Sequence, residues 1–177
     1  MPDNQKDIYY ISAETNAQAL ASPHLEGFKS KKIPVLIMTD AIDQFWLPMI
    51  GSFKEKKFTS ITQGKINLDD LNSKDKDKKS DNKDQKEKQD KEYIDLIAQL
   101  KVVLGEQVKD IRLSSKLTDS PVCLVADEGD MDIAMEQLMA QRDTNYKGAP
   151  RILEINGDHS LIKNMKSLIS KKENNDL

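Results

Sequence analysis

Cysteine, histidine and aromatic residues are scarce in this 177-residue chain, which has one cysteine, two histidines and 5% aromatic residues. The single cysteine, Cys123, leaves no internal disulfide to stabilise the fold, and this usage is typical of the reducing cytoplasm. One cysteine and two histidines are too few for a zinc site of the usual types. No apolar run approaches the roughly 18 residues that span a bilayer, so we expect no membrane segment.

Known catalytic and nucleotide-binding motifs are missing as well. The chain has no GxGxxG fingerprint, no GxxxxGK[ST] phosphate loop and no HExxH metal motif. Cys123 and His159 are the residue types of a nucleophile–base pair, but we do not expect them to act as one. Cys123 stands in the apolar run PVCLV, where a cysteine behaves as a small hydrophobe. We expect His24 and His159 to be structural. The sequence therefore predicts no catalytic, cofactor-binding or metal-binding residues.

Charge divides the chain into three segments. The net charge of −3 is small, and no basic cluster of the kind that binds nucleic acid is present. Residues 72–92 contain charged and polar residues but no apolar one. Such a segment cannot bury enough surface to fold alone, and it is either a flexible linker or a solvated helical extension. We therefore divide the chain into 1–71, 72–92 and 93–177.

The first segment alternates strand and helix patterns. Strands are predicted at 8–11, 33–38 and 58–62, and helices follow Ser12 or Thr15, Ser22 and Thr39 or Asp40 as N-caps. Residues 33–38 are apolar on both faces, as in a buried parallel strand. These patterns predict a small three-stranded parallel β-α-β-α-β module with an α/β fold.

The third segment has a different order of elements. A helix is predicted from Tyr93 to Leu104 with Gly105 at its end, followed by strands at 108–113, 121–126 and 151–155. Asp127 or Asp130 is expected to cap a helix that runs to about residue 141, and Asp158 to cap the last helix. This segment is predicted to be an α+β module.

Methionine is the unusual feature of the helix near residue 135. Met131, Met135, Leu138 and Met139 share one helical stripe, while Ile133 and Ala140 fall on the other side. Flexible methionine side chains suit a surface that accepts varied partners, although the same stripe also fits core packing. A second aromatic and apolar cluster, with Phe45, Trp46 and Met49, is open to the same two interpretations.

Six short strings resemble, in order and spacing, the heat shock protein 90 chaperones. In the first segment they are IYYISA at 8–13, SPHLE at 22–26 and VLIMTDAID at 35–43. In the third they are VKDIRL at 108–113, LTDSP at 117–121 and LEINGDH at 153–159. The resemblance identifies residues 1–71 as the end of the middle domain and residues 93–177 as the start of the C-terminal domain.

This resemblance implies an ATP-driven, homodimeric clamp that assists protein folding in the cytoplasm, with clients and co-chaperones as partners. ATP and magnesium would bind an N-terminal domain that this chain lacks, so we expect neither a cofactor nor enzymatic activity here. We also expect no tight dimer, because the dimerisation helices of the family are missing. The family's client-contact regions correspond to Phe45, Trp46 and Met49, and to the stripe of Met131, Met135, Leu138 and Met139.

Two other functions stay open. A free-standing small α/β enzyme or ligand-binding domain would place its ligand at the carboxyl ends of the first strands, near Ser12–Glu14 and Thr39–Asp40. A truncated chaperone could also act as a decoy that competes for clients of the complete protein. Interdomain coupling and client contact remain the functions that the resemblance favours.

Overall fold

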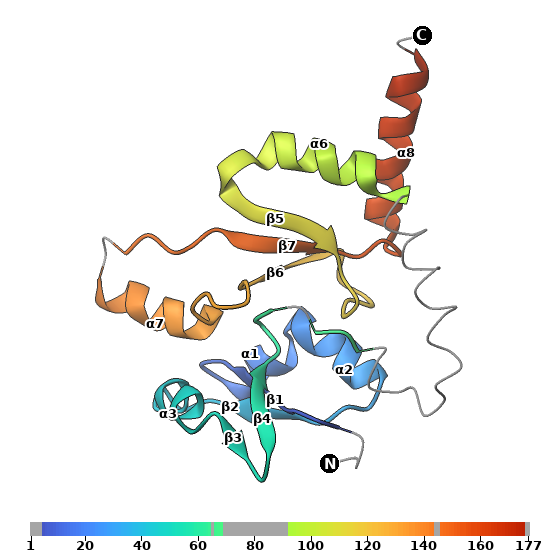
Figure 1. Ribbon diagram of the computed structural model, residues 1–177. Coiled ribbons are helices and arrows are strands. Elements are labelled where there is room, and N and C mark those ends of the chain that lie inside the picture. Colours follow the sequence, from blue (N-terminus) through green and yellow to red (C-terminus); the bar gives the residue numbers. More distant parts are fainter. Residues whose placement is uncertain (1–4, 65, 69–91, 144–145, 176–177) are drawn as a thin grey trace.

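The computed structural model describes residues 5–64, 66–68, 92–143 and 146–175, with the side chains of the last helix described as far as residue 169. The predicted linker, residues 72–92, lies outside these ranges except for Glu92. In Figure 1 the first part of the chain forms the lower layer and the part after Glu92 forms the upper layer.

The lower layer is a sheet in the strand order β2-β1-β4-β3. Strands β1 (Ile8–Ser12), β2 (Val35–Met38) and β4 (Lys56–Ser60) are parallel, which confirms the predicted three-stranded parallel sheet. A short strand that we did not predict, β3 (Ser52–Phe53), pairs antiparallel with β4 at one edge. The prediction that residues 33–38 form a buried strand is wrong, because β2 is the other edge strand and Leu36 is exposed. Strand β4 also lies two residues earlier than predicted.

Helices α1 (Asn16–Leu20), η1 (Pro23–Leu25), α2 (Glu26–Ser30) and α3 (Asp43–Ile50) connect these strands. Thr15 and Ser22 are N-caps of α1 and η1, as two of the predicted caps require. The cap predicted at Thr39 or Asp40 is wrong: α3 begins after Ile42, because a turn with a hydrogen bond from Asp43 N–H to the Asp40 carbonyl comes first. The core of this layer consists of Tyr9, Ile11, Ala19, Leu25, Phe28, Ile61, Ile66 and Leu68.

The upper layer has a three-stranded sheet in the order β5-β7-β6. Its strands are β5 (Val108–Leu113), β6 (Val122–Val125) and β7 (Arg151–Ile155), with β7 parallel to β5 and antiparallel to β6. Helices α6 (Ile94–Leu104) and α8 (Ser160–Asn175) pack on one face of this sheet around Leu96, Ile111, Ile155 and Ile162. A short helix, η3 (Gly105–Gln107), follows α6, and Gly105 caps α6 with a positive φ of 51° as predicted.

Helix α7 (Ile133–Arg142) lies between β6 and β7 in the chain and at one side of the molecule. Its N-cap is Asp132 instead of the predicted Asp127 or Asp130, which belong to the preceding turn. At the start of α8 the Leu161 N–H donates to Nδ1 of His159 at 3.1 Å, so this histidine takes the place predicted for Asp158. The structural role expected for His159 thus has a specific contact.

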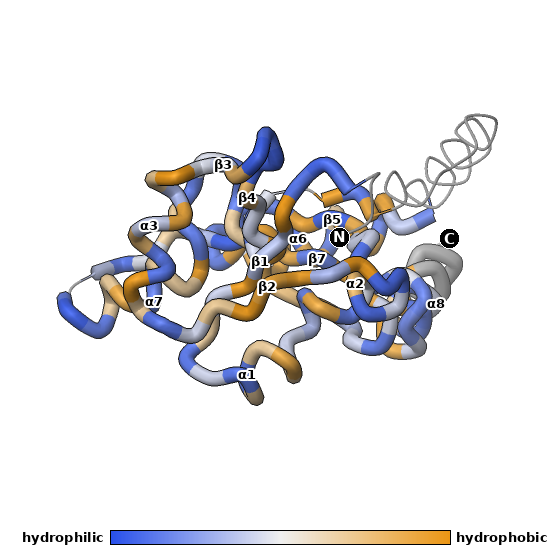
Figure 2. The backbone as a smooth tube through the Cα atoms, turned by 90° about the horizontal axis from the view of Figure 1, so that it is seen from below, coloured by the Kyte–Doolittle hydropathy of each residue, from blue (hydrophilic) through white to orange (hydrophobic). Residues whose placement is uncertain are grey.

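Direct backbone pairing joins the two layers. Gln63 and Ala126 form an isolated parallel β-bridge, with Ala126 N–H donating to the Thr62 carbonyl at 2.9 Å and Gly64 N–H to the Ala126 carbonyl at 2.8 Å. The segment after β4 therefore continues along the upper layer instead of turning away from it. This pairing positions α3 of the lower layer beside α7 of the upper layer, as both Figure 1 and Figure 2 show.

Candidate functional site

Asp132 attaches the beginning of α7 to the lower layer. Its Oδ1 accepts a hydrogen bond from Ala134 N–H at 2.9 Å, which caps the helix. Its Oδ2 accepts hydrogen bonds from the hydroxyls of Ser60 at 2.5 Å and Thr62 at 2.7 Å. One carboxylate therefore both starts α7 and fixes that start to the end of β4.

A second carboxylate, Glu26 of α2, binds a loop of the upper layer. It accepts hydrogen bonds from the backbone N–H groups of Thr118, Asp119 and Ser120 and from the Ser120 hydroxyl. Partial burial disfavours the charged carboxylate, but these hydrogen bonds outweigh it and lower the pKa of Glu26. The loop of the upper layer thus surrounds the Glu26 carboxylate of the lower layer with hydrogen-bond donors.

Buried charges lie at the centre of the junction. The Nζ of Lys116 donates to the Ile61 carbonyl at 3.2 Å and lies 3.7 Å from Oε2 of Glu154. Glu154 also pairs with Arg112, whose guanidinium donates to the Gly64 carbonyl at 2.9 Å. Burial lowers the pKa of Lys116, and the nearby Glu154 opposes that shift. Each cation therefore binds a carbonyl of the lower layer while sharing one buried carboxylate of the upper layer.

Helices α3 and α7 form the two walls of a groove. A cavity of about 430 Å³ is lined by Tyr10, Ser12, Gln44, Pro48, Gln63, Gly129, Asp130, Met131, Asp132 and Met135. A second cavity of about 260 Å³ is lined by Ala13, Glu14, Thr39, Asp40, Ala41, Gln44, Ala134, Gln137, Leu138 and Gln141. Gln44 lines both cavities, so they follow one another along a single groove, which we call the α3–α7 groove. It runs past the carboxyl ends of β1 and β2, where the alternative ligand site was predicted.

Three of the four residues of the predicted stripe line this groove, but Met131 precedes the N-cap Asp132, so the prediction that it lies on the helix is wrong. Met131 and Met135 line the larger cavity and Leu138 the smaller one. Met131 and Met139 are 39% and 40% exposed, whereas the buried positions of α7 are Ala134 and Glu136. The stripe therefore does not fill the core, although Met139 lines neither cavity.

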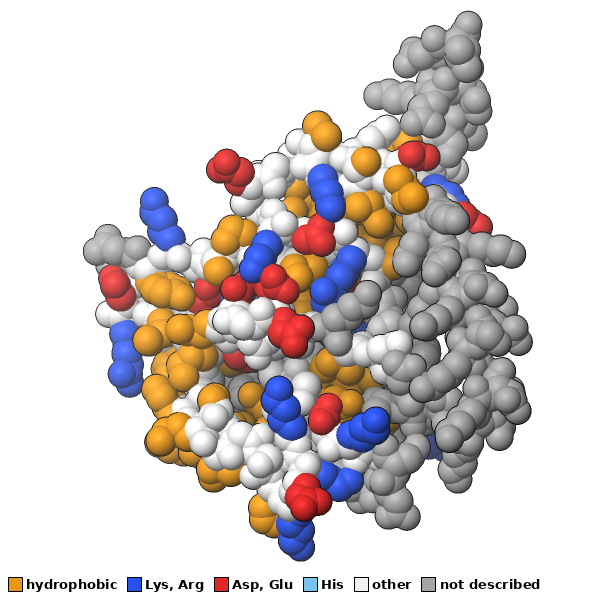
Figure 3. Space-filling model, in the orientation of Figure 1, with side chains coloured by type: hydrophobic (Ala, Val, Ile, Leu, Met, Phe, Trp, Pro, Cys, Tyr) orange, Lys and Arg blue, Asp and Glu red, His pale blue; other side chains and the backbone are white. Residues whose placement is uncertain are grey.

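The predicted residues of α3 lie outside the cavity lining. Phe45 is 39% exposed and Met49 is 84% exposed. Trp46 is more restrained, since its ring packs edge-on against Phe58 and its Nε1 donates to Asp43 at 2.7 Å. Hydrophobic side chains gather along this edge of the molecule, over α7 and α3, at the left of Figure 3. The two predicted regions thus flank one continuous surface.

Sequence reasoning missed several residues that shape the groove, notably Gln44, Pro48 and Glu136. Glu136 looks like a solvent-facing charge, yet it is buried, pairs with Arg151 and accepts a hydrogen bond from Ala149 N–H at 2.7 Å. This contact fixes the body of α7 to the start of β7. Proline inside α3 was the one visible signal, because a proline within a helix is unusual, and Pro48 lines the larger cavity.

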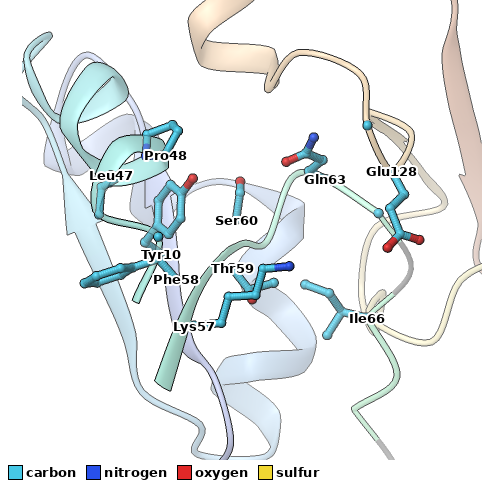
Figure 4. Close-up of a pocket in the computed structure, with 13 residues that line it drawn as sticks. Tyr10, Leu47, Pro48, Lys57, Phe58, Thr59, Ser60, Gln63, Ile66 and Glu128 are labelled. Atoms are coloured by element: carbon cyan, nitrogen blue, oxygen red, sulfur yellow. The ribbon is translucent and has the colours of Figure 1, made fainter. Parts of the chain in front are cut away.

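A further cavity of about 350 Å³ lies between the layers beside the groove (Figure 4). Tyr10, Phe58 and Ser60 of the first sheet line it on one side and Glu128 on the other, with Gln63 also in the lining.

Within the described residues, no group of three or more His, Cys, Asp or Glu could hold a metal ion. Across those same ranges, no helix combines the length and apolarity needed to cross a membrane.

Comparisons with known proteins place the chain in a class of chaperones. A family model described as Hsp90 protein matches residues 1–177. The chain belongs to the Hsp90 family.

Several relatives that it matches carry the name Chaperone protein HtpG. That of Roseobacter denitrificans is 44% identical over 160 residues, which make up 90% of this chain and 25% of the relative. Those of Streptomyces coelicolor and Wolbachia pipientis are 39% and 40% identical over 93% and 98% of this chain. The chain spans about a quarter of the length of these relatives.

Proposed function

We propose that the α3–α7 groove, with the exposed apolar side chains beside it, is a contact site for unfolded or partly folded client proteins. The observation that carries this proposal is the position of Met131 and Met135 in a groove that opens to solvent, next to exposed Phe45 and Met49. Apolar groups in such a place gain little from the fold itself and are available to a partner. Polarizable methionine adapts to apolar segments of varied shape.

A pair of charge substitutions tests client binding. Met131→Glu and Met135→Glu should each weaken binding of a permanently unfolded, carboxymethylated protein roughly ten- to a hundredfold, because burying one such side chain contributes about 1.5–3 kcal/mol. Leu168→Glu is the matched control, since Leu168 is exposed on α8, away from the groove. Fluorescence anisotropy measures the binding and calorimetry the melting. Equal weakening by the control would contradict the assignment of the groove, and so would unchanged binding by both methionine variants.

The second part of the proposed function is coupling between the layers through Asp132. This carboxylate caps α7 and accepts hydrogen bonds from Ser60 and Thr62 of the lower layer. A movement of the lower layer would therefore displace the beginning of α7, which borders the groove. Replacing both hydroxyls, Ser60→Ala with Thr62→Val, removes the attachment and keeps the cap. Hydrogen exchange at α7 should then speed up while exchange at α6 stays unchanged. Equal exchange at α7 before and after would refute coupling by this route.

Properties of the whole protein follow from the family and are part of the same proposal. They are an ATP-driven clamp cycle with magnesium, a homodimer, co-chaperone partners and a place in the cytoplasm. For this chain we propose client contact without catalysis. Calorimetric titration with ATP should give no heat; heat that Asp40→Asn abolishes would favour the alternative ligand site at the ends of β1 and β2.

A further inference from the structure

Charge is distributed unevenly along the α3–α7 groove. Four carboxylates line its two cavities, and no lysine or arginine does. They are Glu14 and Asp40 in the smaller cavity and Asp130 and Asp132 in the larger one.

The carboxylates of the larger cavity already have partners. Asp130 pairs with Lys109 at 3.0 Å, and Asp132 accepts the hydrogen bonds from Ser60 and Thr62 described above. The neighbouring cation Arg151 pairs with Glu136 and donates to the Met131 carbonyl. Lys109 and Arg151 therefore offset part of the negative charge of Asp130 and Asp132. The negative charge without an ion pair among the described residues is at the other end of the groove.

Glu14 and Asp40 carry that charge. Both are exposed, and no lysine or arginine of the described residues pairs with either of them. Glu14 accepts one hydrogen bond, from Gln141 of α7 at 3.4 Å, which leaves its second oxygen open. Beside them lies apolar Leu138, so an apolar contact and a negative charge adjoin within one cavity.

Amide side chains complete the lining. Gln44, Gln137 and Gln141 lie along the smaller cavity, and amides both donate and accept hydrogen bonds without carrying charge. The Oε1 of Gln44 is shielded from solvent and has no hydrogen-bond partner among the described residues. An extended peptide has free backbone N–H and C=O groups that such amides match.

We propose that the groove selects extended client segments in which an apolar stretch adjoins lysine or arginine. The apolar side chains would lie against Met131, Met135 and Leu138, and the basic side chain would lie between Glu14 and Asp40. This selectivity rests on the proposed client function and names the chemistry of its client. Exposed ion pairs are individually weak, so the preference for a basic over an acidic flank is expected to be roughly tenfold at low salt and smaller at high salt.

Three labelled peptides test the selectivity. They share one apolar core and differ only in flanks of two lysines, two glutamates or two glutamines. Anisotropy titrations should rank them lysine first, glutamine second and glutamate last. The double variant Glu14→Gln with Asp40→Asn should bring the lysine and glutamate peptides to within roughly twofold of each other. Its matched control, Asp95→Asn with Glu106→Gln, removes the same net charge at α6 and η3 and should keep the ranking.

Each outcome decides a different point. Equal binding of the lysine and glutamate peptides by the parent chain overturns the selectivity but leaves client binding standing. Loss of the ranking in the Asp95 and Glu106 control also overturns it, because net charge would then be the cause. If no peptide binds, and Met135→Glu leaves the binding of the carboxymethylated protein unchanged, the proposed client function itself is refuted. A second copy of the chain is the occupant if sedimentation shows a dimer that Met135→Glu dissociates, and that result overturns the selectivity as well.

Discussion

Acid lowers the stability of this fold through one buried histidine. His24 is 8% exposed, and its Nδ1 has no hydrogen-bond partner within the part of the chain that the structure describes. Burial, followed by the positive charge of Lys116, lowers its pKa from 6.5 to about 4. In the unfolded chain the imidazole titrates near its ordinary value, so between these two pKa values only the unfolded chain takes up the proton. The contribution of neutral His24 to the free energy of unfolding is therefore fully present above about pH 6.5, and it is lost as the pH falls toward 4.

The expected loss follows from the size of that shift. A pKa lowered from 6.5 to about 4 corresponds to about 3 kcal/mol between the two ends of the range. Urea unfolding, followed by the fluorescence of Trp46, measures the free energy of unfolding at each pH. His24→Gln should lack this contribution. The difference in free energy of unfolding between this variant and the parent should therefore change by about 3 kcal/mol from pH 7 to pH 4.

A non-titrating control separates this effect from general destabilisation. Ile61→Val removes a buried methyl group of the same core and should lower the free energy of unfolding by about 1 kcal/mol at every pH. Parallel pH profiles of the parent and His24→Gln would refute the reasoning, because the buried imidazole would then not be kept neutral by the fold.

The other predictions concern three further buried residues. Gly27→Ala should lower the melting temperature, at a cost of about 1–3 kcal/mol, because a Cβ there would lie 2.5 Å from the Lys116 carbonyl oxygen; an unchanged melting temperature in calorimetry would contradict this close approach. Lys116→Met should cost about 1–3 kcal/mol in urea unfolding, since the Ile61 carbonyl loses its donor and the buried Glu154 loses a neighbouring cation, and a stabilised variant would show that the buried amine is dispensable. Burial and the negative Glu154 raise the pKa of Cys123 to about 12, so iodoacetamide at pH 8 should react far more slowly with the folded chain than with the urea-unfolded chain; equal rates would disprove the protection.

Periodicity predicted the parallel sheet and failed at its edges for physical reasons. An apolar run such as residues 33–38 indicates a strand but not its place in the sheet, and here β1 occupies the centre while β2 is left at the edge. Strand β3 depends on a turn in which Lys54 and Glu55 both have positive φ, at 47° and 63°. No glycine or asparagine marks that turn, so the usual hairpin signal is absent.

The sequence suggested candidate site residues but not how they are arranged on a surface. The stripe of α7 has apolar groups on both sides, and helical spacing cannot decide which side faces solvent. The side that faces solvent is set by the contacts of Asp132 and Glu136. Asp132 binds Ser60, which is far away in the sequence, and Glu136 binds Arg151, which lies beyond the end of α7. No local pattern encodes such contacts. The family resemblance suggested residues near α3 and α7, and only the packing of the two layers showed that these helices share a groove.

The bridge between Gln63 and Ala126 has a consequence for the α3–α7 groove. Leu68 is fully buried in the lower layer, and Glu92 pairs with Lys166 of the upper layer, so the chain is held by a different layer before and after residues 69–91. The bridge holds the end of β4 against the segment that leads into α7. A shift of either layer at this bridge would therefore change the width of the α3–α7 groove.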